Sequence, residues 1–250
     1  MIDSLRLQRK VRKRLCQQMP DLSRPQGDNL AWMMSGLHLG QHVHLSKIAQ
    51  HRVGSADLDS KTKQVRRLLK NNEAIEPQVL QEPLAEQLLR AVAASQKRVR
   101  ILMDTVELSG QRQILMAALA YRRRALPLRW EVRRREGVSG AKEQISLLKM
   151  LSGQIPSGAE VVVVGDGAFH STELMDYIET RGWHFRLRLH SDTYVRLSGE
   201  TGWKELREVA PNEGERRYLQ NVQLTAKRAT DKRQTVRPGQ LGPLASRRGR

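Results

Sequence analysis

Apolar side chains in the first ninety residues recur at the spacing of α-helices. Three of them, four positions apart among lysines and arginines, predict an amphipathic basic helix over residues 5–19. The segment 21–29 contains Pro and Gly and should be a linker, with Asp28 or Asn29 capping the next helix. Three further helices are predicted at 45–53, 60–72 and 76–95.

From residue 97 onward the apolar residues form short, compact runs, which is the pattern of β-strands. The four valines at 161–164 do not alternate with polar residues, so their strand should be covered on both faces. Helices are predicted between the later strands, over 139–155 and 170–182. The predicted strands are 97–104, 113–121, 127–133, 160–166 and 183–191.

The order of these elements is strand, strand, strand, helix, strand, helix, strand, which is the arrangement of ribonuclease H-like domains. The chain is therefore predicted to be an α+β protein, with a helical N-terminal region followed by a mixed-sheet domain. In this arrangement the strands at 99–104 and 161–165 lie side by side and parallel.

An aspartate ends each of these two strands, Asp104 and Asp166. Open sheets build their sites at the carboxyl ends of parallel strands, so the two carboxylates should lie close together. Neighbouring carboxylates repel unless a divalent cation such as Mg²⁺ binds between them, and a metal pair would activate phosphodiester chemistry. The alternative is structural, because Asp often follows a strand as a turn or cap residue. Asp166 could cap the helix that begins near His170.

The net charge of +18, from 44 basic and 26 acidic residues, favours a polyphosphate partner such as nucleic acid. A basic ribosome-associated protein is the alternative. The single cysteine, Cys16, excludes a disulfide framework and fits a reducing cytosol. The chain has no 18-residue apolar run, so no membrane contact is predicted and a cytoplasmic, nucleoid-associated location is expected.

Two basic clusters are candidate DNA contacts. In the helix at 60–72, apolar residues (Val65, Leu68 and Leu69) should occupy one face and basic residues the other. An ordinary basic-faced bundle or a solvated hairpin tip would explain the same charges. Arg133, Arg134 and Arg135 also flank a predicted strand and could follow a DNA backbone. The candidate DNA-binding residues are Lys63, Arg66, Arg67, Lys70, Arg122, Arg123 and Arg124.

The segments "RVRILMDTVELSG" and "VVVVGDGAFHSTELMDYIETRGWHF" resemble the first two acid blocks of DDE transposases of the bacterial insertion sequence 4-like group. In that group a strand ends in Asp and a small hydroxyl residue, which Asp104 and Thr105 match. A second strand ends in Asp, Gly and an aromatic residue, which the segment from Asp166 to Phe169 matches. The resemblance covers residues 25–218.

This resemblance implies an enzyme that binds double-stranded DNA at transposon ends and joins it to target DNA. It implies Asp104 and Asp166 as catalytic metal ligands for Mg²⁺ or Mn²⁺, a DNA-binding N-terminal region, and a homodimer as an assembly to be considered. The third acid of the family, a Glu within a Tyr, Arg, Glu, Lys helix, has no match. Tyr194, Arg196 and Glu200 have the wrong spacing, and their segment is predicted to be a hairpin.

Three regions follow: a helical DNA-binding region (1–92), a ribonuclease H-like domain (93–218) with a β insertion from 190, and a basic tail (219–250). The tail should be disordered or the product of a lost reading frame, which would make the chain a truncated and inactive transposase. A DNA-binding stub that competes at transposon ends is the second hypothesis. The third is a resolvase or repair nuclease of the same fold whose remaining acid is Glu107, Asp176 or Glu200.

Overall fold

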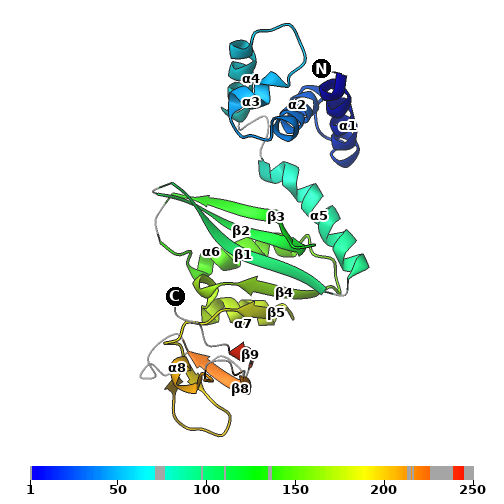
Figure 1. Ribbon diagram of the computed structural model, residues 1–250. Helices are drawn as coiled ribbons and strands as arrows, with labels where there is room; N and C mark the ends of the chain where they lie inside the picture. The colour runs from blue at the N-terminus through cyan, green and yellow to red at the C-terminus, as the bar shows by residue number, and fades with distance from the viewer. Residues whose placement is uncertain are drawn as a thin grey trace. The chain divides into compact units, whose positions relative to one another are not determined.

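The computed structural model describes residues 2–70, 77–96, 98–109, 111–134, 137–212, 215, 217–225 and 239–244. It divides the chain into two compact units, Met1–Gln87 and Leu88–Arg250. The division falls inside α5 (Pro77–Ser95), the same helix that contains the boundary predicted at residue 92. Helices build the first unit, and two sheets with their covering helices build the second (Figure 1).

The first unit consists of short helices joined by two apolar clusters. One cluster links α1, α2 and α5 through Leu15, Met19, Leu30, Ala31, Leu80 and Leu84. The other links α2, α3 and α4 through Trp32, Ile48, Ala49 and Val65. The helices are α1 (Ile2–Gln18), α2 (Arg24–Gly40), α3 (Leu45–Gln50), α4 (Leu58–Lys70) and the first half of α5.

Helix α2 begins at Arg24, before the predicted caps Asp28 and Asn29. Ser23 has extended backbone angles, and its N–H donates to Gln26 Oε1 at 3.0 Å, which satisfies one donor at the helix start. The proline after Arg24 already has the helical φ angle and suits the first turn. The linker is therefore shorter than predicted, because it consists only of the residues between Gln18 and Arg24.

Helix α4 begins next to Asp57, whose carboxylate accepts hydrogen bonds from the N–H and the Oγ–H of Ser60, each at 2.8 Å. These bonds, the backbone one first, hold the pKa of Asp57 below its ordinary value. Val65 is fully buried, whereas Leu69 is 51% exposed, so the apolar face is narrower than predicted. The polar face of α4 is correspondingly wide.

The second unit is built on a five-stranded sheet in the order β3-β2-β1-β4-β5. β2 pairs antiparallel with β1 and with β3, whereas β4 pairs parallel with β1 and with β5. This is the sheet of a ribonuclease H-like domain, and the predicted parallel pairing of the first and fourth strands is confirmed. The strands are β1 (Arg98–Ser109), β2 (Arg112–Tyr121), β3 (Arg124–Arg133), β4 (Glu160–Gly165) and β5 (His184–Leu187).

Helices α6 (Ala141–Ser152) and α7 (Thr172–Thr180) cover one face of this sheet. α6 packs against β2 and β3, α7 packs against β5, and the two helices contact each other. Val161, Val162 and Val163 are all buried, as the absence of alternation in β4 predicted. The largest fully buried apolar side chains of this unit include Ile101, Leu115, Leu119, Leu128, Leu147, Leu148, Leu151, Leu174 and Ile178.

Strand β1 is longer than predicted and continues from Asp104 to Ser109. Its last residues pair with the start of β2, so that Ser109 is opposite Arg112. Antiparallel pairing satisfies the backbone of these residues whatever their side chains, which explains how a segment whose Val106 and Leu108 are exposed can extend the hairpin. The β2–β3 connection is also tighter than predicted, since Tyr121 already pairs with Arg124.

The residues after β5 form a second sheet in the order β7-β6-β8-β9. Strands β6 (Tyr194–Arg196) and β7 (Lys204–Glu205) form the predicted hairpin, next to the short helix α8 (Leu206–Val209). Residues 219–225 and 239–244 of the predicted tail lie in the paired strands β8 (Arg217–Thr225) and β9 (Gly239–Leu244). Its other positions lie outside the described residues.

Among the helices that the structure describes, none combines the length and apolar composition needed to cross a bilayer.

Candidate active site

The two predicted metal ligands lie on neighbouring strands of the five-stranded sheet. β1 and β4 run parallel, and their last register pair is Met103 with Gly165. Asp104 is the next residue of β1 and Asp166 is the first residue after β4, so the register brings the two to neighbouring positions. Asp104 was predicted to end its strand, but this is wrong. β1 continues past Asp104 to Ser109, paired with β2.

The two aspartates belong to the face of the sheet that α6 and α7 leave uncovered. Side chains alternate along a strand, and Ile101 and Met103 are buried, which assigns Asp104 to the other face. Asp166 keeps an extended backbone (φ −81°, ψ −166°), so it stays in step with its neighbour and shares that face. Both aspartates are exposed.

Asp166 is also the N-cap of a 3-10 turn, Gly167–Phe169. Its Oδ1 accepts the N–H of Ala168 at 2.9 Å. Helix α7 has a different cap, Ser171, whose Oγ accepts the N–H of Leu174, so the alternative in which Asp166 caps that helix is wrong. Within the described residues, Oδ2 of Asp166 makes no hydrogen bond or ion pair. The structural and the metal-binding interpretations are therefore compatible with each other.

Gly165 sets the direction in which the chain leaves β4. The buried Phe169 rests against it, and a Cβ added at Gly165 would lie 2.9 Å from Phe169 Cβ and 3.0 Å from two ring atoms. Real side chains essentially never approach so closely. A larger residue would displace the 3-10 turn and with it the carboxylate of Asp166.

Two histidines contact the same turn. The carbonyl oxygen of Gly167 lies 2.5 Å from His170 Nδ1 and 2.8 Å from His190 Nε2, and the rings meet edge to face with centroids 4.5 Å apart. A carbonyl only accepts hydrogen bonds, so both nitrogens must carry protons there. His170 is only four residues from Asp166 in the sequence. His190 was missed, because it follows β5 and no local motif connects it to the turn.

The donor set of the two aspartates fits Mg²⁺ or Mn²⁺. Carboxylate oxygens are hard ligands, and Mg²⁺ is usually held by one or two carboxylates together with waters and substrate phosphates. Among the described residues, neither Asp104 nor Asp166 forms an ion pair with a basic side chain. A divalent cation between them would therefore offset the repulsion of the two negative charges.

No third acid joins this pair in the part of the chain that the structure describes. No group of three His, Cys, Asp or Glu side chains is placed there to hold a metal ion. Glu200 forms an ion pair with Lys204 at 2.8 Å between β6 and β7. Glu107 is three residues after Asp104 in β1, so its side chain belongs to the opposite face of the sheet. Asp176 is in α7, which covers that opposite face.

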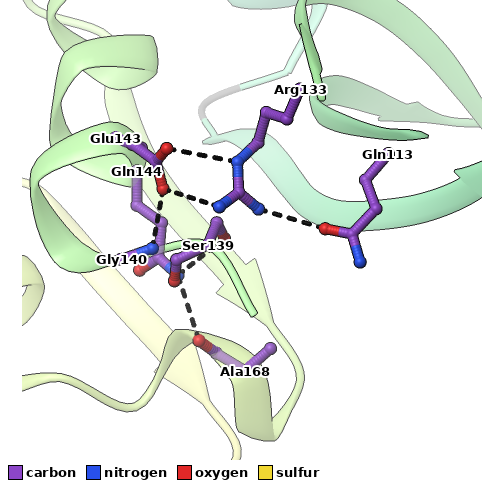
Figure 2. Close-up of polar contacts among 7 residues, drawn as sticks. All are labelled: Gln113, Arg133, Ser139, Gly140, Glu143, Gln144 and Ala168. Carbon is purple, nitrogen blue, oxygen red and sulfur yellow. Dashed lines mark hydrogen bonds and ion pairs between the residues drawn. The ribbon is translucent and has the colours of Figure 1, made fainter. Parts of the chain in front are cut away.

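Arg133, predicted with its two arginine neighbours to follow a DNA backbone, is buried instead, and Figure 2 shows its contacts with Glu143 and Gln113. Its Nε and Nη2 contact Glu143 Oε1 and Oε2 at 3.2 and 3.0 Å, and its Nη1 donates to Gln113 Oε1 at 3.1 Å. With a side chain only 5% exposed, Arg133 ties β3 to β2 and α6 and is not available to DNA. Arg134 is exposed, and Arg135 lies outside the described residues.

The other candidate DNA contacts are on the surface. Lys63, Arg66, Arg67 and Lys70 are exposed on α4, and Lys63 pairs with Asp59 at 2.7 Å. At the tip of the β2–β3 hairpin the exposed residues are Arg122, Arg123 and Arg124.

Comparison with known proteins gives one family. The family model described as "Transposase DDE domain" matches residues 109–250, a range that begins after Asp104 and includes Asp166. No curated protein matches the chain.

Two of the similar solved structures are transposases. The catalytic domain of Mos1 mariner transposase is 12% identical over 42% of this chain and 57% of that chain, with a TM-score of 0.27. The Mos1 strand transfer complex is 11% identical over 62% of this chain and 56% of that chain, with a TM-score of 0.26. The chain thus corresponds to just over half the length of each. Because the family match spans more than half of the sequence, the chain belongs to the transposase DDE domain family.

Proposed function

We propose that the chain is a transposase that binds double-stranded DNA at transposon ends and, where a third acid completes the site, cuts and joins phosphodiesters with Mg²⁺ or Mn²⁺. Asp104 and Asp166 are the proposed metal ligands, in a catalytic domain over residues 93–218. The observation that carries the proposal is the parallel register of β1 and β4, since the two acids follow its last pair. The family match supports the reaction class.

In this mechanism the chain's own residues hold and orient the two carboxylates. The N–H of Thr105 donates to Asp104 Oδ1 at 2.8 Å, and the N–H of Ala168 donates to Asp166 Oδ1 at 2.9 Å. Within the described residues, Oδ2 of each aspartate makes no hydrogen bond or ion pair and would be available to a ligand. The bound metal would stabilise the attacking and leaving oxygens of the phosphodiester. The paired strands supply the rigid support that such a site needs.

The helical region 1–92 is proposed to supply DNA contacts through the basic face of α4. Lysines and arginines neutralise phosphates and release counterions, so exposed basic side chains on a helix suit this role. The arginines at the β2–β3 tip are proposed as further phosphate contacts. A chain with this partner would be found on the nucleoid.

The proposal is tested with Asp104→Asn and Asp166→Asn in the full chain. Each change should reduce Mn²⁺-dependent nicking of DNA by at least about a hundredfold, because metal stabilisation of the transition state is worth several kcal/mol. Mn²⁺ affinity, measured by calorimetry without DNA, should fall in parallel. Asp192→Asn, at an exposed acid before β6, is the control and should change neither quantity. Unchanged Mn²⁺ affinity in both site variants would disprove the metal site.

A second candidate function is DNA binding without chemistry, as in a stub that competes at transposon ends. The absence of a third acid among the described residues favours it. In that case gel shifts would detect DNA binding by the wild type and by Asp104→Asn with equal affinity. Neither protein would nick DNA at any Mg²⁺ or Mn²⁺ concentration.

A further inference from the structure

Gln144 is a fully buried polar residue at the start of α6, with no exposed surface. Its Nε2 lies within hydrogen-bond distance of three acceptors: Ser139 O at 2.8 Å, Ser139 Oγ at 3.0 Å and Ala168 O at 3.0 Å. Figure 2 shows the amide reaching from α6 to Ala168 in the turn after β4. The side chain therefore joins two segments that are distant in sequence.

The turn that Gln144 contacts is the one that orients Asp166. The N–H of Ala168 donates to Asp166 Oδ1, and the carbonyl of Ala168 accepts from Gln144. Ala168 thus accepts a hydrogen bond from the buried amide of Gln144 and donates one to the carboxylate of Asp166. The carbonyl of Gly167, in the same peptide unit as the Ala168 N–H, is held by His170 and His190.

Burial of an amide is costly unless its polar atoms are bonded, so its hydrogen bonds identify what the residue contributes. Within the described residues, every hydrogen bond of the Gln144 side chain uses its donor, Nε2, and Oε1 has no partner there. An apolar side chain of similar volume would fill the same space but would leave the carbonyl of Ala168 without this donor. The donor is the part of Gln144 that the fold uses.

We propose that Gln144 is a positioning residue for Asp166. It acts through Ala168, by holding the 3-10 turn Gly167–Phe169 in the orientation that keeps the carboxylate on the face shared with Asp104. This inference rests on the proposed function in one respect, the role of Asp166 as a metal ligand. The hydrogen bonds themselves do not depend on it.

The neighbouring residue Glu143 provides a matched comparison. It accepts the N–H of Gly140 at 2.9 Å and forms the ion pair with Arg133, so these contacts brace the start of α6 and join it to β3. Changes at Glu143 and at Gln144 should both destabilise the protein. Only a change at Gln144 should alter the site.

The test uses the full chain with Gln144→Met, which keeps the volume and removes the donor. Mn²⁺ affinity measured by calorimetry without DNA should fall by about tenfold or more, as when a group that orients a ligand is lost. Hydrogen exchange at the amide of Ala168 should become faster. Glu143→Gln should lower the melting temperature but retain the wild-type Mn²⁺ affinity and the wild-type exchange at Ala168.

A Gln144→Met protein that folds and has unchanged Mn²⁺ affinity would overturn the inference, provided that Asp166→Asn does lose affinity. If Asp104→Asn and Asp166→Asn also keep wild-type affinity, it is the proposed function that fails. Exchange at Ala168 would still report whether Gln144 orders the turn. If Gln144→Met does not fold, hydrogen exchange at the Ala168 amide is measured in the wild-type protein. Exchange as fast as in an open loop would contradict the positioning role.

Discussion

At the scale of single residues, the tip of the β2–β3 hairpin combines charge with backbone strain. Arg122 and Arg123 have φ angles of 46° and 64°, in the left-handed region that Gly and Asn adopt most easily. They form a two-residue turn with both central φ angles positive, which matches the twist of a hairpin. Arginine is less stable than Gly or Asn in this conformation, but it places positive charge at the exposed tip, as a role in binding phosphates would require.

Replacing the turn by Arg122→Asn with Arg123→Gly should therefore stabilise the protein and weaken DNA binding. The expected gain is about 1 kcal/mol in the free energy of unfolding, because the strain of the left-handed arginines is relieved. Urea unfolding and DNA titration would measure the two effects. Arg124→Gln is the control, since it removes charge from the tip without relieving strain. A stabilised double variant with wild-type DNA affinity would exclude the tip from the interface.

Asp166 illustrates how a residue can have two roles that sequence analysis treats as alternatives. One carboxylate oxygen caps the 3-10 turn, and the other makes no hydrogen bond or ion pair within the described residues. Capping orients the carboxylate, so the structural role favours the proposed chemical one.

At the scale of elements, the close approach of α2 and α3 depends on Gly36. A Cβ there would lie 2.7 Å from the carbonyl oxygen of Ile48, a backbone atom that cannot move aside cheaply. Gly27, in the same helix, has only ordinary contacts, with its nearest neighbour at 3.5 Å from a Cβ. These two glycines form a matched pair.

Gly36→Ala should destabilise the protein by about 2 kcal/mol, the usual cost of overpacking a well-packed contact. Gly27→Ala should be neutral or stabilise by up to about 1 kcal/mol, because alanine favours the helix. Thermal unfolding followed by circular dichroism would compare the two. Equal effects of both changes would show that α2 and α3 are less tightly packed than the structure has them.

At the scale of the whole molecule, the net charge of +18 predicts a strong salt dependence of DNA binding. If Arg66 and Arg67 contact phosphates, changing both to Gln should reduce the slope of log K against log salt by about 1.8, or 0.9 per contact. Lys142→Gln with Lys149→Gln on α6 removes the same charge from exposed positions outside the proposed interface. Filter binding at several salt concentrations would distinguish them, and equal slopes for both pairs would refute the role of α4.

Local pattern was sufficient to predict the helices of the first unit, the interior strand of valines and the parallel pairing of β1 with β4. These features follow from hydrophobic periodicity and from the short list of topologies that the order of elements allows. The two candidate ligands follow from the same pattern, because each comes directly after a run of apolar residues.

Tertiary structure decided the features that depend on residues distant in sequence. Pairing with β2 extends β1 beyond Asp104, and a partner strand rather than local composition determines where such a strand ends. The ion pair with Glu143 buries Arg133, although its sequence neighbours are basic. Gln144 and His190 reach the turn of Asp166 from elements that packing brings there. A sequence specifies the period of each element directly, but contacts between elements exist only after the chain has folded.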